Sequence, residues 1–400
     1  MSNQGTIRSD YQAFIERNAP DSLRGSRKGA FDGFWGGRAW VHENPDYLVW
    51  RDRCLAYGLT APTWPIAYGG ADLDGDAYSA WEQALVDAKV PPPVVGFGLT
   101  MIGPTLMHYG TEEQKRQHLP AIVRGDIRWC QGYSEPGAGS DLASLSTQAL
   151  LDGDSLVVTG QKVWTSYAHL SDWIFLLVRT SRKERKQQGI TFLLMDLNSP
   201  GVEIRPIDLI SGSSPFCEVF FDQVRVPMSQ VVGAVDEGWG IAKALLGFER
   251  SMIGAAIAGQ LKGLEQPLVA SARSALGQQE GRLCDELLRH QIASYAMDER
   301  CYHEVLNRID NARRAGRPPG PEASVIKLVG TELKKERFDL EMQIAGQRSL
   351  GWDGPGFESK EIDGTRAWLR SRANSIEGGT SEIQLNILAQ RVLGLPKSTS

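Results

Sequence analysis

The sequence predicts an α+β fold in which a central region of β-strands separates two helical regions. Apolar residues recur at helical spacing before about residue 126 and again after residue 236. Between them lie short runs rich in β-branched and aromatic residues, with turn residues at their ends. We therefore expect three domains, with limits at 1–126, 127–235 and 236–400.

The N-terminal region is predicted to consist mainly of helices joined by Gly- and Pro-rich loops. Residues 77–90 have apolar side chains at three- and four-residue spacing. Thr111 is a suitable N-cap for a further helix, because Gln114 follows three residues later. The loops at 25–38 and 61–76 are rich in Gly, Trp and Pro, and we expect them to be packed surface loops.

The central region is predicted to contain five strands without intervening helices, at 155–164, 172–180, 189–197, 202–210 and 217–227. Such spacing is typical of an antiparallel sandwich or barrel. The basic run at 182–188 falls between two of these strands, where a solvated hairpin loop is favoured over a binding patch.

The C-terminal region returns to helical periodicity. Apolar and small residues recur at helical spacing in four stretches, at 238–277, 289–310, 323–346 and 380–394. This periodicity predicts a helical domain. No internal repeat is visible in the sequence.

Composition excludes several classes of function. A net charge of -5 over 400 residues disfavours a nucleic-acid binder, which usually carries a basic excess. No apolar run approaches a membrane span, and the N-terminus lacks the pattern of a signal peptide. The five cysteines and six histidines are scattered, which indicates reduced thiols and no metal site. We expect a cytoplasmic enzyme that binds neither membrane nor nucleic acid.

The stretch WCQGYSEPGAGSDL at 129–142 is the most informative. Its small residues Gly137, Ala138 and Gly139 would let backbone N–H groups approach a flat or anionic ligand. It lacks the G-x-G-x-x-G pattern of dinucleotide folds. From the residues alone, a tight turn is the favoured interpretation.

The segment YSEPGAGSDL closely resembles the flavin-binding segment of the acyl-CoA dehydrogenase family. WPIAYGG, HYGTEEQKRQHLPAIVRGD, GQKVWTSYA, DEGWGIAKALLGFER and GGTSEIQLNILAQRVLGLP also resemble family motifs and occur in the family's order. The resemblance spans nearly the whole chain. It implies an N-terminal helical domain, a central antiparallel β-domain, a C-terminal four-helix bundle and bound FAD.

The resemblance also implies which residues contact FAD. Tyr133 and Ser134 match positions facing the flavin pyrimidine ring, and Trp164 and Ser166 match positions beside the isoalloxazine. Gly139 and Ser140 match positions at the FAD pyrophosphate and the CoA thioester arm, so that Ser140 is also a substrate contact. The remaining matches to FAD-contacting positions, some of them facing a neighbouring subunit's FAD, are Arg273, Gln343, Gly346, Gln347, Thr380 and Glu382. The link after residue 277 is longer than in the family pattern.

Two glutamates compete for the role of the base that removes the substrate's α-proton. One branch of the family has its base in a Tyr-Glu-Gly-Thr segment, but here Glu377 matches the tyrosine and Gly378 the base. A second branch carries the base on a C-terminal-domain helix, where this sequence has Glu249 followed by Arg250. The resemblance therefore implies Glu249 as base, Gly378 N–H as a thioester contact and Arg250 as a CoA or packing contact.

The function implied is α,β-desaturation of an acyl-CoA, with electrons passed to an electron-transferring flavoprotein. Base position and loop motifs resemble members acting on bulky, cyclic, steroid side-chain or dicarboxylic acyl groups, in homotetramers or α2β2 heterotetramers. The alternatives are a flavin oxidase or monooxygenase, a non-catalytic partner subunit, and a DNA-binding relative that the acidic balance disfavours.

Overall fold

The computed structural model describes residues 3–27, 32–39, 44–247, 265–314, 320 and 324–396. The chain divides into two compact units. The first comprises Met1–Ile207 with Ser214–Glu249, and the second Asp208–Ser213 with Arg250–Ser400.

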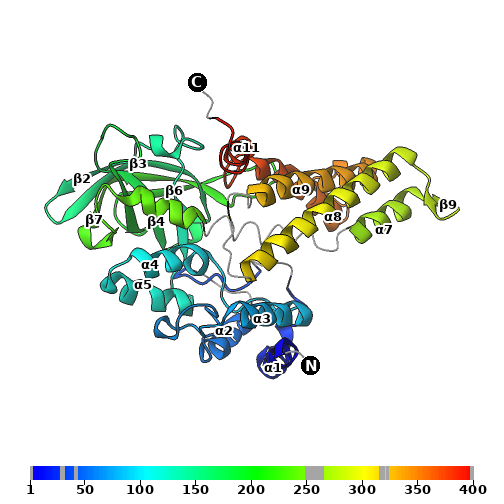
Figure 1. The fold of residues 1–400 in the computed structure, drawn as a ribbon, viewed down its shortest axis with the longest axis horizontal. Coiled ribbons are helices and arrows are strands. Elements are labelled where there is room, and N and C mark those ends of the chain that lie inside the picture. Colours follow the sequence, from blue (N-terminus) through cyan, green and yellow to red (C-terminus); the bar gives the residue numbers. More distant parts are fainter. Residues whose placement is uncertain are drawn as a thin grey trace. The chain divides into compact units, whose positions relative to one another are not determined.

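The first unit begins with helices, as predicted. Thr111 and Gln114 cap α5 reciprocally: the Gln114 N–H donates to Thr111 Oγ1 at 3.2 Å, and the Thr111 N–H donates to Gln114 Oε1 at 3.0 Å. The stacked rings of Trp50 and Trp81, both fully buried, lie in the core of this helical part. Its α-helices are α1 (Asn3–Asn18), α2 (Asp46–Leu55), α3 (Gly75–Ala88), α4 (Gly103–Tyr109) and α5 (Glu112–Arg124) (Figure 1).

The same unit continues into a β-sheet that contains all five predicted strands. Its strand order is β6-β7-β3-β2-β4-β5-β8, and β1 pairs with β4. Most pairs are antiparallel, as expected, and the difference from the expected sheet is that β4 also pairs in parallel with β1 and β2. Parallel pairing is possible there because long connections separate those strands along the chain. The strands are β1 (Trp129–Gly132), β2 (Gln148–Asp152), β3 (Ser155–Ser166), β4 (Trp173–Arg179), β5 (Ile190–Asp196), β6 (Val202–Ile207), β7 (Phe216–Pro227) and β8 (Val231–Val232).

Helix α5 packs directly on the sheet. Gln114 Nε2 donates to the carbonyl oxygens of Ser229 and Val231 at 2.7 and 2.8 Å. One turn later, His118 is buried between the rings of Trp129 and Trp173, with ring centroids 5.1 and 4.7 Å away. These contacts fix the helical part against the strand that leads into the glycine-rich loop.

His118 should make the first unit sensitive to acid. Burial lowers the pKa of this imidazole from 6.5 to about 4, although a hydrogen bond to Gln230 opposes the shift. The unfolded chain therefore takes up this proton at a higher pH than the folded chain. As pH falls from 6.5 to about 4, the free energy of unfolding should fall by about 3 kcal/mol.

Urea denaturation of the wild type and His118→Gln across that pH range measures this effect. The variant should lose the steep part of the pH dependence. His108→Gln is the matched control, because His108 is exposed on α4. An unchanged pH dependence in His118→Gln would show that other groups govern the acid response.

Among the described residues of the second unit, the secondary structure is helical apart from one hairpin. Helix α9 packs against α8, α10 and α11, and a core that includes Tyr295, Tyr302 and Leu340 lies where it meets α8. The long link after residue 277 forms the hairpin β9–β10, in which Glu280 and Gly281 adopt φ values of 50° and 75°. The elements are α7 (Glu265–Leu276), β9 (Gln278–Gln279), β10 (Arg282–Leu283), α8 (Glu286–Arg314), α9 (Ser324–Ala345), α10 (Ser359–Ser371) and α11 (Ser381–Ile387) (Figure 1).

Other sequence expectations concern membranes, metals and thiols. Within the described ranges, no helix is both long and apolar enough to cross a membrane. Nor do those residues contain a cluster of three or more His, Cys, Asp or Glu side chains that could hold a metal ion. All five cysteines carry free thiols.

Candidate active site

Tyr133 and Ser134 follow β1 directly and lie against the end of β3. Lys162 Nζ donates to the Tyr133 carbonyl oxygen at 3.2 Å, and the Val163 N–H donates to the Ser134 carbonyl oxygen at 2.9 Å. Tyr133 itself is buried. Trp164 and Ser166, which are expected beside the isoalloxazine, follow Val163 in β3. The fold therefore brings two stretches that are distant in sequence close together.

A buried carboxylate, Glu135, holds the glycine-rich loop in place. Its Oε2 accepts from the Ser146 N–H and hydroxyl, and its Oε1 accepts from the Thr147 N–H and, at 2.8 Å, from Lys162 Nζ. The Lys162 and Glu135 side chains are only 0% and 4% exposed. Burial raises the pKa of Glu135, but Lys162 and the hydrogen bonds outweigh that effect and hold it below the ordinary value. The loop is thus anchored to β2 and β3 by one charged group.

The glycines of this loop leave its outer side open. Glu135 and Ala138 exchange two main-chain hydrogen bonds of 3.0 Å, which closes a tight turn. A Cβ built on Gly137 or Gly139 meets no atom within 4 Å, and neither glycine has positive φ. Neither packing nor backbone conformation therefore explains these glycines. An exposed backbone without side chains, continuing into exposed Ser140, fits a ligand that contacts main-chain N–H groups, as FAD would.

Trp164 has an unusual backbone and an exposed ring. It lies where the pairing of β3 with β7 shifts register, between Lys162 and Thr165. Its φ is 60°, and 56% of the residue is exposed. Left-handed backbone costs a bulky residue about 1–3 kcal/mol, and such strain gathers at functional sites. The bulge turns the ring away from the core, where it meets Phe216 edge-on at 6.1 Å and lies close in sequence to Ser166, the last residue of β3.

Gly139→Ala tests whether the open side of the loop is a ligand surface. The new methyl group meets no protein atom, so the melting temperature of the FAD-free protein should change by less than about 2 °C. FAD affinity should nevertheless fall by about tenfold or more, because the methyl group occupies space that the ligand needs.

Gly75→Ala is the matched control, since a Cβ there also meets no atom within 4 Å. Gly75→Ala should change neither the melting temperature nor the FAD affinity. FAD binding by Gly139→Ala at wild-type affinity would remove the flavin role from this side of the loop.

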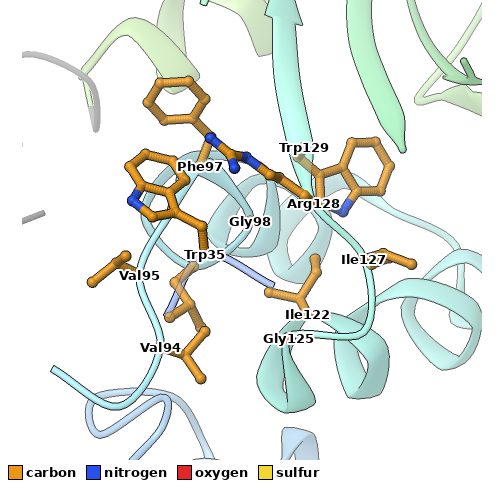
Figure 2. Close-up of a pocket in the computed structure, with 12 residues that line it drawn as sticks. Trp35, Val94, Val95, Phe97, Gly98, Ile122, Gly125, Ile127, Arg128 and Trp129 are labelled. Atoms are coloured by element: carbon orange, nitrogen blue, oxygen red, sulfur yellow. The ribbon is translucent and has the colours of Figure 1, made fainter. Parts of the chain in front are cut away.

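A packed loop supports the end of β3 from the helical side. Figure 2 shows Trp35 and Phe97 lining a small pocket with Arg128. The Arg128 guanidinium lies 4.5 Å from the Trp35 ring centre and 5.1 Å from that of Tyr167, the residue after Ser166. The pocket holds about 10 Å³, roughly one water molecule. It therefore serves packing here, and the loop containing Trp35 is a packed loop as predicted.

The second unit carries the other expected FAD contacts, on separate elements. Arg273 is exposed on α7, and its guanidinium donates to the Gly281 carbonyl oxygen in the hairpin at 3.4 Å. Gln343 lies in the last turn of α9, and Gly346, with φ of 54°, begins the turn that follows with Gln347. All four predicted contacts are exposed on this unit.

Glu377 is engaged within its own unit. Its Oε2 accepts from Arg370 Nη2 at 2.7 Å, and its Oε1 accepts from the Asn374 side-chain amide at 2.5 Å. The next residues, Gly378 and Gly379, have φ values of 63° and 93°. The chain therefore turns sharply directly after a carboxylate that is already paired.

Thr380 and Glu382 lie at the start of α11. Thr380 is its N-cap, since the Ile383 N–H donates to Thr380 Oγ1 at 3.3 Å. Hydrogen bonds from its own N–H and from Thr380 lower the pKa of Glu382. Both residues thus have local structural roles besides any contact with FAD. Glu249 and Arg250 lie outside the described residues.

The sequence reasoning did not identify Glu135 and Lys162. The sequence did contain a sign of this pair. Lys162 is an even number of residues from Leu156 and Val158, so it points to the same, buried face of β3. A lone lysine on an apolar strand face requires a buried partner. Glu135 is the partner, and only the folded chain identifies it.

Family models identify the class of protein. Residues 38–126, 130–224 and 236–393 match the N-terminal, middle and C-terminal domains of acyl-CoA dehydrogenases. The chain belongs to the acyl-CoA dehydrogenase family, whose enzymes are FAD-dependent oxidoreductases, and it has the family's three-domain fold.

Individual relatives narrow the comparison. The chain is 40% identical over 364 residues to "Acyl-CoA dehydrogenase IpdE1" of Mycobacterium tuberculosis. The aligned region covers 87% of this chain and 88% of the relative. A solved structure described as "Tcur3481-Tcur3483 steroid ACAD" matches with a TM-score of 0.79 and 28% identity, over 99% of this chain and 98% of that one. The ChsE4-ChsE5 complex of Mycobacterium tuberculosis matches with a TM-score of 0.72 and 28% identity, over 100% and 99%.

Proposed function

We propose that this chain desaturates an acyl-CoA between Cα and Cβ, with Glu249 removing the α-proton. Bound FAD would supply the acceptor for the β-hydride at its N5 atom, and an electron-transferring flavoprotein would then take the electrons. The similarity to a steroid dehydrogenase and to IpdE1 favours a bulky or cyclic acyl group.

The open glycine-rich loop is the observation that carries this proposal. Glu135 anchors the main chain of this loop on its buried side. On its outer side Gly137 and Gly139 leave the main chain open. Such a loop can present N–H groups to a bound ligand without rearranging, which is what orientation of a cofactor and thioester requires. Trp164 and Ser166 would bound the isoalloxazine from the neighbouring strand.

The assignment of the base draws support from the surroundings of Glu377. To accept a proton, that carboxylate would have to give up its ion pair with Arg370 and its bond from Asn374. A base for a weakly acidic C–H group needs a free oxygen directed at the carbon. We therefore assign Glu249 this role, and Gly378 the role of a main-chain donor to the thioester oxygen.

The experiment that tests the function is anaerobic titration of the purified protein with a panel of acyl-CoAs. The panel includes straight, branched, dicarboxylic and steroid side-chain acyl groups. Loss of the visible flavin absorbance identifies dehydrogenation and ranks the substrates. An oxidised flavin that no member reduces would refute the proposal, and rapid oxygen consumption during turnover would favour an oxidase.

We further propose that the chain assembles as a tetramer, either of identical chains or of two kinds as α2β2. The support is that the structural relatives include complexes of two differently named chains. Sedimentation of the protein alone and mixed with a second acyl-CoA dehydrogenase chain distinguishes these forms. A monomer with full activity would contradict both.

A further inference from the structure

Ser166 is followed directly by a residue with a strained backbone. Tyr167 adopts φ of 55° and ψ of 27°, in the left-handed region that bulky residues rarely occupy. The surrounding structure has to impose this conformation one residue after Ser166. We propose that Arg128 imposes it: by holding the Tyr167 ring, Arg128 acts as a positioning residue for Ser166 at the flavin. The inference rests on the proposed function, because it concerns the residue expected beside the isoalloxazine.

Hydrogen bonds hold the main chain of Tyr167 on both sides. Its N–H donates to the Pro215 carbonyl oxygen at 2.6 Å, which extends the pairing of β3 with β7 by one residue beyond Ser166. Its carbonyl oxygen accepts from the Leu170 N–H and from Ser171 Oγ, both at 2.9 Å. A shift of the Tyr167 backbone would break these bonds, so the position of its ring is coupled to that of Ser166.

The Tyr167 ring packs against a cation. The Arg128 guanidinium lies 5.1 Å from the centre of this ring and 4.5 Å from that of Trp35. The two ring centres are themselves 5.4 Å apart, and Phe97 meets Trp35 edge-on at 5.8 Å. Figure 2 shows the Arg128 side chain extending toward Trp35 and Phe97. A cation over an aromatic face is attracted by the π electrons of the ring, so this guanidinium restrains both rings at once.

Arg128 is itself fixed by Asp172. The Arg128 N–H donates to Asp172 Oδ2 at 2.7 Å, and the Asp172 N–H donates to the Arg128 carbonyl oxygen at 2.9 Å. The same carboxylate accepts from the N–H of Arg38, three residues after Trp35, at 3.1 Å. One carboxylate therefore holds Arg128 close to the loop that carries Trp35, and the two form a fixed support for the Tyr167 ring.

The charge of Arg128 argues against a packing role alone. The residue is only 6% exposed. Burial lowers the pKa of its guanidinium to about 10, so the group stays charged at neutral pH. Burial of a cation is costly, and an apolar side chain of similar length would fill the same space at lower cost. What the guanidinium adds is a directional attraction to the Tyr167 ring.

A double-mutant cycle on FAD affinity tests the proposal. Arg128→Met keeps much of the side-chain length but removes the charge, and Ser166→Ala removes the hydroxyl. Each should weaken FAD binding about fivefold, the usual worth of one hydrogen bond. In the Ser166→Ala background, Arg128→Met should cost less than about twofold more, because the contact that it misplaces is already gone. Titration of the FAD-free protein with FAD, followed by flavin fluorescence, measures the affinity.

Variants of Tyr167 test the intermediate step. Tyr167→Phe keeps the aromatic ring and should bind FAD within about twofold of the wild type. Tyr167→Leu removes the ring and should reproduce Arg128→Met in both backgrounds, and it takes the place of Arg128→Met in the cycle if that variant does not fold. Arg205→Met is the matched control, because Arg205 is exposed on the edge strand β6 and lies 4.7 Å from the Phe220 ring centre. It should leave the FAD affinity unchanged.

Wild-type FAD affinity in Arg128→Met or in Ser166→Ala would overturn the proposal. So would an equal effect of Arg128→Met with and without the Ser166 hydroxyl, which is the result expected of a residue that only packs. The proposed function fails by a different result. If no acyl-CoA reduces the flavin, desaturation is refuted, whereas the cycle on FAD affinity still decides whether Arg128 positions Ser166.

Discussion

Glu249→Gln should lower the rate of flavin reduction by an acyl-CoA by about 10³-fold, within the range typical for loss of a general base. The amide has nearly the shape of the carboxylate but cannot take the α-proton. Stopped-flow reduction under anaerobic conditions measures the rate. FAD content and the affinity for a non-reducible thioether analogue should stay near wild-type values, because neither requires proton transfer.

Glu377→Gln is the comparison that makes this test decisive. A glutamine keeps one acceptor oxygen for Arg370, and its NH2 group can donate to the Asn374 side-chain oxygen once that amide turns over, so the turn leading into Gly378 should persist. Flavin reduction should remain within about tenfold of wild type, since an ion pair of this exposure contributes about 1 kcal/mol or less. If the two variants exchange phenotypes, the base is Glu377 and the resemblance to the second branch has misled us.

Glu135→Ala should destabilise the first unit by about 3–5 kcal/mol, the usual cost of leaving one member of a buried ion pair without its partner. Lys162 would lose its counter-ion in an apolar interior, where burial already lowers the pKa of its ammonium group, and the N–H groups of Ser146 and Thr147 would lose their acceptor. Urea denaturation measures the stability. FAD binding should weaken in parallel, because the loop loses the anchor beneath its glycines.

Two controls separate burial from charge. Asp152→Asn removes a carboxylate from the exposed pair with Arg225, in which both side chains are more than half exposed, and should cost less than about 1 kcal/mol. Glu135→Gln/Lys162→Met removes both charges and should recover much of the stability lost in Glu135→Ala. A stability loss in Glu135→Ala no larger than in Asp152→Asn would mean that the pair does not hold the loop.

Local sequence patterns were sufficient for most elements. The capping signal at Thr111 and Gln114 gave the start of α5, because a cap depends on residues three positions apart. The five strands were visible because they are rich in β-branched and aromatic residues and are separated by turn residues. Strands β1, β2 and β8 were not predicted, since β1 pairs with a strand far along the chain, β2 is exposed except at Ala149, and β8 has only two residues. The hairpin in the long link was likewise not foreseen, because its Glu280–Gly281 turn is not one of the Asn-Gly or Asp-Gly pairs that usually mark a hairpin.

The site divides in the same way. By its motifs alone the sequence determined the family, the glycine-rich loop and the residues expected around FAD, because these features are contiguous along the chain. Only the tertiary structure decided that Glu135 pairs with Lys162, that Glu377 is held by Arg370 and Asn374, and that the Arg128 guanidinium lies over the Tyr167 ring. Charged groups act through space over a few ångströms, and the partners that satisfy them are selected by folding.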